Sequence, residues 1–97
     1  MKIAVTYENG QVFQHFGKTE AFQVYEVEGN EVVSSRPMDT NGSGHGALAA
    51  LLAEQGVDVV ICGGIGDGAQ DALAQAGIQV CSGASGSADT AVEAYLK

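Results

Sequence analysis

The sequence predicts one α/β domain built on a mixed, five-stranded sheet with helices on both faces. Two short runs, residues 2–7 and 57–62, are rich in Val and Ile and carry little charge, as expected of strands buried on both faces. Residues 20–27 and 31–36 are strand-like and flank Glu28-Gly-Asn, which predicts an antiparallel hairpin. Helix-like segments alternate with the later strands, an arrangement typical of right-handed crossovers in a partly parallel sheet.

The composition fits a single domain that spans residues 1–97. Hydrophobic residues make up 45% of the chain and aromatic residues 6%, so we expect a core of Val, Ala, Leu and Ile. Twelve acidic and four basic residues give a net charge of −8, which disfavours nucleic acid as a partner. No apolar run reaches the roughly 18 residues of a membrane span, and Met1-Lys2 leads straight into a strand. We therefore expect a cytoplasmic protein with reduced cysteines, and the oligomeric state stays open.

The first half of the chain contains the antiparallel part of the sheet. The strand at residues 2–7 ends at the turn sequence Glu8-Asn-Gly, and residues 11–18 are expected to form an ordered loop. Imperfect alternation within the first hairpin strand predicts partial cover on both faces. Residues 37–46 hold proline, serine and three glycines without periodicity, so we expect this stretch to be mobile without a ligand.

Three helices and two strands complete the chain. We expect helices from Ala47 to the stop at Gly56, from Asp67 to the stop at Gly77 and over residues 88–96, with strands at 57–62 and 78–81. The Asp67 carboxylate is placed to cap the N–H groups near Gln70. Two loops rich in glycine and serine, residues 63–68 and 82–87, follow the two strands.

Ligands bind such sheets beyond the carboxyl ends of the parallel strands. We expect three loops to meet there: the loop that carries His15, and those at residues 63–68 and 82–87. The irregular loop that carries His45 is positioned to close over them. Because imidazole and thiolate groups bind transition metals, His15, His45 and Cys62 are the candidate metal ligands.

Each candidate ligand also has a simpler structural explanation. His15 could merely form hydrogen bonds within its own loop, and His45, between two glycines, could simply be exposed. Cys62 and Cys81 follow apolar strand residues, where cysteine usually acts as a small buried hydrophobe. The chain has no Cys-x-x-Cys or His-x-x-x-His pair, which disfavours a structural zinc site.

Motifs of other functional classes are incomplete. Residues 64–69 satisfy G-x-G-x-x-A, but the next strand ends in Val80-Cys-Ser instead of an acidic residue, and no lysine completes a phosphate-binding loop. A small nucleotide- or anion-binding regulatory domain that uses this loop is therefore the alternative function. The predicted topology also matches the ribonuclease H-like architecture, but residues 2–7 contain no carboxylate to hold a metal pair, which argues against nuclease activity.

Six motifs occur in order along the chain: Met1-Lys-Ile-Ala-Val, His15-Phe-Gly-Lys, Gly44-His-Gly, Gly56-Val-Asp-Val-Val-Ile-Cys-Gly-Gly-Ile-Gly, Ala76-Gly-Ile and Gly83-Ala-Ser-Gly. In order and spacing they resemble the dinitrogenase iron-molybdenum cofactor biosynthesis family, which includes the NifX-like carriers and the C-terminal part of NifB. The resemblance implies a ribonuclease H-like fold without nuclease activity, the binding of anionic metal-sulfur clusters, and His15 as the favoured cluster contact. Relatives commonly have Gly-Pro where this chain has Gly66-Asp, which places a negative charge beside the expected pocket.

The expected protein is a carrier and not an enzyme. It binds an iron-sulfur or molybdenum-containing metal-sulfur cluster and exchanges it with donor or acceptor proteins. Backbone N–H groups and helix N-termini can hold negative charge spread over sulfides, while one imidazole or thiolate supplies a metal bond. The residues expected to contact the cluster are His15, Phe16, Gly17, His45, Gly63, Gly64, Ile65, Gly66 and Ser85.

Overall fold

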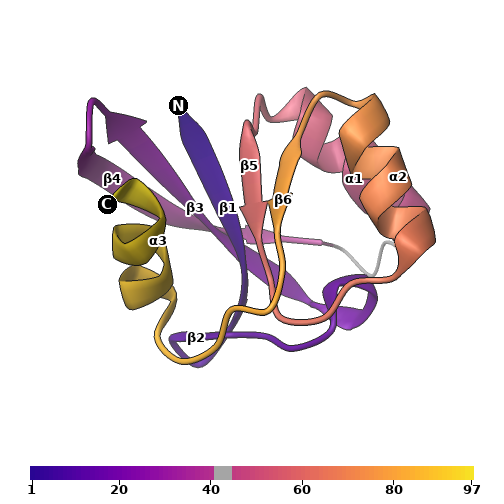
Figure 1. The fold of residues 1–97 in the computed structure, drawn as a ribbon, viewed down its shortest axis with the longest axis horizontal. Coiled ribbons are helices and arrows are strands. Elements are labelled where there is room, and N and C mark those ends of the chain that lie inside the picture. Colours follow the sequence, from indigo (N-terminus) through magenta and orange to yellow (C-terminus); the bar gives the residue numbers. More distant parts are fainter. Residues whose placement is uncertain (41–44) are drawn as a thin grey trace.

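The computed structural model describes residues 1–40 and 45–97 and shows a mixed sheet with helices on both sides (Figure 1). The strands lie in the order β4-β3-β1-β5-β6, and a short β2 pairs with β1. The strands are β1 Lys2–Glu8, β2 Gln11–Val12, β3 Ala21–Glu28, β4 Glu31–Asp39, β5 Val59–Ile61 and β6 Gln79–Cys81. The helices are the 3-10 helix η1 Phe16–Lys18 and the α-helices α1 His45–Glu54, α2 Asp67–Gln75 and α3 Ala88–Leu96. The predicted mixed α/β architecture is confirmed.

The sheet has six strands where the sequence predicts five, because β2 adds two residues antiparallel to the end of β1. The turn between them, Asn9-Gly10, has positive φ at both positions, as its sequence predicts. A two-residue strand is too short to show alternation, so only an ordered loop could be predicted there. β1 also pairs antiparallel with β3 and parallel with β5, and β5 pairs parallel with β6.

Each face of the sheet has its own hydrophobic core. Toward α1 and α2, Ala4 and Val60 belong to a buried cluster with Phe16, Phe22, Leu48, Leu52 and Leu73. Toward α3, the neighbouring strand residues Ile3, Val5, Val59 and Ile61 belong to a second cluster that includes Val92 of α3. Successive residues of a strand point to opposite faces, so β1 and β5 are buried on both sides, as their uncharged runs predict.

β4 is longer than predicted and largely exposed. The sequence places its end at Arg36, but the strand continues through Pro37 to Asp39 and keeps its pairing with β3. An edge strand tolerates proline, because one side of its backbone has no strand partner to receive an N–H. The predicted irregular stretch is therefore shorter, and α1 begins at His45 instead of Ala47. Mobility is expected of residues 37–46, and of these, residues 41–44 lie outside the described part of the chain.

The helix starts differ in how they are capped. Asp67 is the first helical residue of α2 and follows Gly66 at the N-cap, so the predicted cap by Asp67 is wrong by one position. Its carboxylate lies instead in the first helical turn, where negative charge interacts favourably with the helix dipole. At α3, Ser87 Oγ accepts a hydrogen bond of 3.4 Å from the Thr90 N–H. None of the described helices has the length and apolar character needed to cross a membrane.

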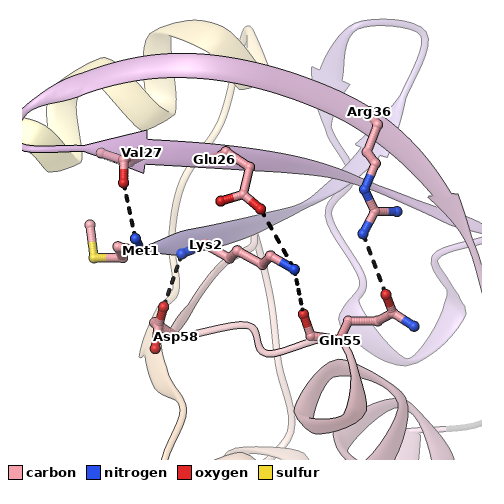
Figure 2. Close-up of polar contacts among 7 residues, drawn as sticks. All are labelled: Met1, Lys2, Glu26, Val27, Arg36, Gln55 and Asp58. Atoms are coloured by element: carbon pink, nitrogen blue, oxygen red, sulfur yellow. Dashed lines mark hydrogen bonds and ion pairs between the residues drawn. The ribbon is translucent and has the colours of Figure 1, made fainter.

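The two ends of the sheet carry different groups. The carboxyl ends of β1, β5 and β6 lie together at the lower side of Figure 1, close to β2 and η1. At the opposite, amino end, polar contacts surround the start of β1 (Figure 2). There the Met1 ammonium donates to the Val27 carbonyl oxygen at 2.9 Å, and the Lys2 N–H donates to Asp58 Oδ2 at 2.9 Å. These bonds attach the first strand to both neighbouring segments.

Candidate functional site

Backbone hydrogen bonds join three segments at the carboxyl end of the sheet: the η1 turn, the loop after β5 (the β5 loop, residues 62–66) and the loop after β6 (the β6 loop, residues 82–87). The Phe16 N–H donates to Gly64 O at 3.0 Å, and the Gly64 N–H donates to Gln14 O at 2.6 Å. The Gly83 N–H donates to Gly63 O at 2.7 Å. The prediction that these three segments meet is confirmed.

Gly63 and Gly64 allow the β5 loop to approach the segment before η1. A Cβ on Gly63 would lie 2.6 Å from Gln14 Oε1 and 2.7 Å from Gln14 Cα, which is too close for any real contact. A Cβ on Gly64 would lie 3.0 Å from Gln14 O. Neither glycine has positive φ, so close backbone approach, and not an unusual turn conformation, requires glycine here. The two predicted contact residues thus have a structural role of their own.

A hollow of about 370 Å³ opens beside this junction, lined by His15, Phe16, Gly17, Lys18, Gly64, Ile65 and Gly66. All but one of these residues belong to the predicted contact set. His15 is exposed at the N-cap of η1, forms a β-bridge with Gly64, and its ring meets Phe13 edge to face at 6.2 Å. Phe16 is buried and packs against Phe22 of β3, with ring centroids 5.9 Å apart. The hollow therefore combines an accessible imidazole with a firmly packed apolar side.

Lys18 is the lining residue that the sequence-based site omits. It ends η1, and its backbone N–H donates to His15 O at 3.1 Å. Its side chain is exposed and forms no ion pair with any residue in the described part of the chain. The available clue was the spacing in His15-Phe-Gly-Lys, because a 3-10 turn brings residues three apart onto one side.

Cys62 belongs to the core and does not line the hollow. Its side chain is fully buried in the cluster between the sheet and helices α1 and α2. Burial, and secondly the neighbouring Cys81 thiol, raise the pKa of Cys62 to about 11, so the thiol is neutral at physiological pH. Cys81 packs against the cluster on the other face, and both cysteines are free. The structure therefore favours the simpler explanation of Cys62 as a small buried hydrophobe.

The other predicted contact residues do not gather at this hollow. Ser85 lies on the β6 loop and lines a second hollow of about 370 Å³ beside α3, together with Cys81 and Tyr95. His45 begins α1, and its side chain lies outside the described part of the structure. Among the described side chains, those of residues 1–40 and 47–97, no three of His, Cys, Asp or Glu come together as a metal site. His15 is thus the metal-binding side chain that the described structure offers at the hollow.

Comparison with known proteins gives a match along the entire chain. Residues 1–97 match the model of a family described as dinitrogenase iron-molybdenum cofactor. An uncharacterized protein of Methanocaldococcus jannaschii is 32% identical over 103 residues, which cover all of this chain and 86% of the relative. The FeMo cofactor biosynthesis protein NifB of Sinorhizobium fredii is 36% identical over 87 residues. That match covers 81% of this chain but 18% of NifB, so it concerns a small part of NifB.

A solved structure supports the same relationship. The apo form of the orange protein from Desulfovibrio gigas is 30% identical to this chain and superposes with a TM-score of 0.86. The match covers 98% of this chain and 86% of the orange protein. The arrangement of sheet and helices is therefore shared with a known structure, whereas the ribonuclease H-like assignment stays a prediction.

Proposed function

The chain belongs to the dinitrogenase iron-molybdenum cofactor family, and we propose that it binds an anionic metal-sulfur cluster as cargo in the hollow beside His15. Its relatives include a FeMo cofactor biosynthesis protein, and the orange protein is described in its apo form, the term for a protein without its bound group. In this proposal the protein carries the cluster between donor and acceptor proteins of the cytoplasm and catalyses no reaction.

The observation that carries the proposal is an exposed imidazole beside an apolar hollow at the start of a helix. Imidazole is a good ligand for iron and related metals. The apolar side chains of Phe16 and Ile65 suit sulfide, since sulfur is a weak hydrogen-bond acceptor. Gly66 lines the hollow and is also the N-cap of α2, so the positive end of that helix dipole begins there.

The small number of ligands supports a carrier in preference to a permanent cofactor site. His15 supplies one metal bond, and no second His, Cys, Asp or Glu is among the described residues that line the hollow. A cluster held by one imidazole, backbone groups and electrostatic attraction can be released to another protein more easily than one held by several thiolates. Exchangeable binding of this kind is what delivery requires.

The alternative, a nucleotide- or anion-binding regulatory domain, has less support. The strand after the glycine loop, β6, ends at Cys81 and continues into Ser82, so no carboxylate stands there to bind a ribose. Close packing against Gln14 already accounts for Gly63 and Gly64. Because a nucleotide-binding domain would bind ATP, ATP is the ligand that tests this alternative.

The substitution His15→Ala tests the proposed function. We would titrate anaerobic protein with tetrathiomolybdate, a soluble molybdenum-sulfide dianion, and follow its absorption spectrum. The molybdenum of this probe is already bound by four sulfides, so the imidazole contacts it through an N–H donated to a sulfide, and loss of that bond should weaken binding roughly tenfold. Ser85→Ala is the matched control: it alters the second hollow, so it should leave the affinity unchanged.

Two further outcomes separate the competing explanations. Cys62→Ser should leave the spectrum of the bound probe unchanged, because the Cys62 sulfur is buried in the core. Equal affinity in His15→Ala and in the unaltered protein would remove this hollow from consideration. Binding of ATP without binding of tetrathiomolybdate would favour the regulatory alternative.

A further inference from the structure

The four basic side chains of this acidic chain, all of which the structure describes, are unevenly distributed. At the amino end of the sheet, the Lys2 ammonium donates to Gln55 O at 2.9 Å and an Arg36 guanidinium N–H donates to Gln55 Oε1 at 3.4 Å (Figure 2). Lys97 follows α3 and lines a hollow of about 660 Å³ between α3 and the start of β4. Lys18 is the basic side chain that lines the His15 hollow.

We infer that Lys18 is the binding residue that selects anionic cargo at this site, an inference that rests on the proposed function. Its position is set by backbone bonds on both sides, from the Lys18 N–H to His15 O at 3.1 Å and from the Thr19 N–H to Phe16 O at 3.4 Å. The hydroxyl of Thr19, which is buried, donates to Ala21 O at 2.8 Å. The attachment point of the lysine side chain is therefore fixed beside the hollow, and the residue is exposed.

The charge of the whole chain opposes the binding of an anion, so a local cation strengthens it. A net charge of −8 repels a dianion from most of the surface. Asp67 adds a negative charge directly after Gly66, which lines the hollow. The partial positive charge at the start of α2 opposes only part of this repulsion. The Lys18 ammonium supplies a full positive charge and, unlike the imidazole of His15, needs no metal orbital to attract the ligand.

Lys18 also lines a neighbouring hollow of about 320 Å³, with Tyr7, Phe13 and Glu20 among the other lining residues. An ion pair with Glu20 would neutralise the ammonium and withdraw it from the ligand. The structure shows no such pair among the described residues. The lysine therefore stands between two hollows with its charge available, and only one of the two hollows contains an imidazole.

The test compares Lys18→Gln, Lys18→Arg and Lys97→Gln in anaerobic titrations with tetrathiomolybdate. Lys18→Gln should weaken binding about fivefold at low salt, the range expected for one exposed charge. Lys18→Arg should bind like the unaltered protein because it keeps the charge. Lys97→Gln makes the same change in net charge on a distant surface and should also bind normally. Sodium chloride should weaken binding less in Lys18→Gln than in the unaltered protein, because screening acts on the charge that this variant lacks.

The outcomes distinguish failure of this inference from failure of the proposed function. If the unaltered protein does not bind tetrathiomolybdate, both ideas are overturned. If it binds, and Lys18→Gln binds equally well with the same salt dependence, only the role of Lys18 is overturned. Equal losses in Lys18→Gln and Lys97→Gln would also overturn it, because net charge alone would then govern binding. Thermal unfolding of each variant checks that the fold is retained.

Discussion

Glycine residues of this chain meet two different physical needs. Gly56 and Gly77 end α1 and α2 with φ of 74° and 80°, a conformation that residues with a Cβ rarely adopt. Gly63 and Gly64 have ordinary backbone angles, and it is the closeness of Gln14 that excludes a side chain. Both helix stops could be predicted from sequence because glycine at a helix end has a local cause. The need for close approach arises only when two segments distant in sequence touch. The glycine cluster therefore predicts a ligand-binding loop, but the sequence does not show that Gly63 and Gly64 are required for packing against Gln14.

At the residue scale, Cys62 should make the fold sensitive to alkaline pH. Burial, followed by the Cys81 thiol, raises its pKa from an ordinary value of 9.0 to about 11. Below pH 9 the thiol is protonated in both states and its contribution to stability is fully present. Between pH 9.0 and about pH 11, the unfolded chain loses the thiol proton that the folded chain keeps, so the free energy of unfolding falls as pH rises. We expect Cys62→Ala to make this fall shallower in urea unfolding from about pH 8 to about pH 11.

The quantity to compare between Cys62→Ala and the unaltered protein is the slope of the unfolding free energy against pH, because removing the sulfur also lowers stability at every pH. Burial and the Asp89 carboxylate raise the pKa of Tyr25 as well, but this tyrosine is present in both proteins and its effect cancels. Cys81→Ala is the comparison variant. Burial raises the pKa of the Cys81 thiol as well, but this thiol is only partly buried, so its removal should change the slope less than Cys62→Ala does. Identical slopes in Cys62→Ala and the unaltered protein would contradict the assignment.

At the element scale, a partly buried hydrogen bond connects α3 to the sheet. Tyr25 of β3 is 3% exposed, and its hydroxyl donates to Asp89 Oδ1 in the first turn of α3 at 2.6 Å. Hydrogen bonds to charged groups contribute about 1.5–3 kcal/mol. We therefore expect Tyr25→Phe to lower the free energy of unfolding by about 2 kcal/mol, measured by urea denaturation near neutral pH.

The matched variant for this contact is Asp89→Asn, which keeps an oxygen acceptor but removes the charge. It should cost less stability than Tyr25→Phe. The double variant should lose less than the sum of the two single losses, because both changes act on one hydrogen bond. Strictly additive losses would mean that the tyrosine and the aspartate stabilise α3 independently.

Element boundaries could be predicted where a local cause marks them. The starts of α2 at Asp67 and of α3 at Ala88 agree with the sequence pattern. β4 runs beyond its predicted end because Pro37 stands on an edge strand, and edge position is a property of the assembled sheet. α1 begins at His45, inside a glycine-rich stretch that has no hydrophobic pattern to show a helix start.

At the scale of the whole molecule, the position of the candidate site could be predicted better than its composition. Strand order decides which loops share the carboxyl end, so His15 and the β5 loop come together as expected. Ser85 does not join them, because the β6 loop attaches through its backbone and its side chains line a hollow beside α3. The spacing of His15-Phe-Gly-Lys gave a clue to Lys18, but only the assembled sheet shows that this lysine lines the hollow beside His15.

The polar contacts of Met1 and Lys2 stabilise the fold at the amino end of the sheet (Figure 2). The proposed site lies at the opposite, carboxyl end (Figure 1). The Lys2 side chain, 29% exposed, pairs with Glu26 at 3.6 Å and donates to Gln55 O at 2.9 Å. Because Gln55 directly follows α1, this lysine connects the first strand to the end of that helix and satisfies one of its terminal carbonyl groups. Lys2 and Lys18 therefore carry the same charge in different roles.

The last prediction follows from this separation. Lys2→Met keeps a long apolar side chain but removes the ion pair and the hydrogen bond, so it should lower the free energy of unfolding by about 1 kcal/mol. Its affinity for tetrathiomolybdate should equal that of the unaltered protein, whereas Lys18→Gln should show the reverse pattern, with normal stability and weaker binding. Urea denaturation and anaerobic titration of both variants measure the two quantities side by side. A loss of affinity in Lys2→Met as large as that in Lys18→Gln would contradict the separation, because binding would then follow the charge of the whole molecule and not the position of one lysine.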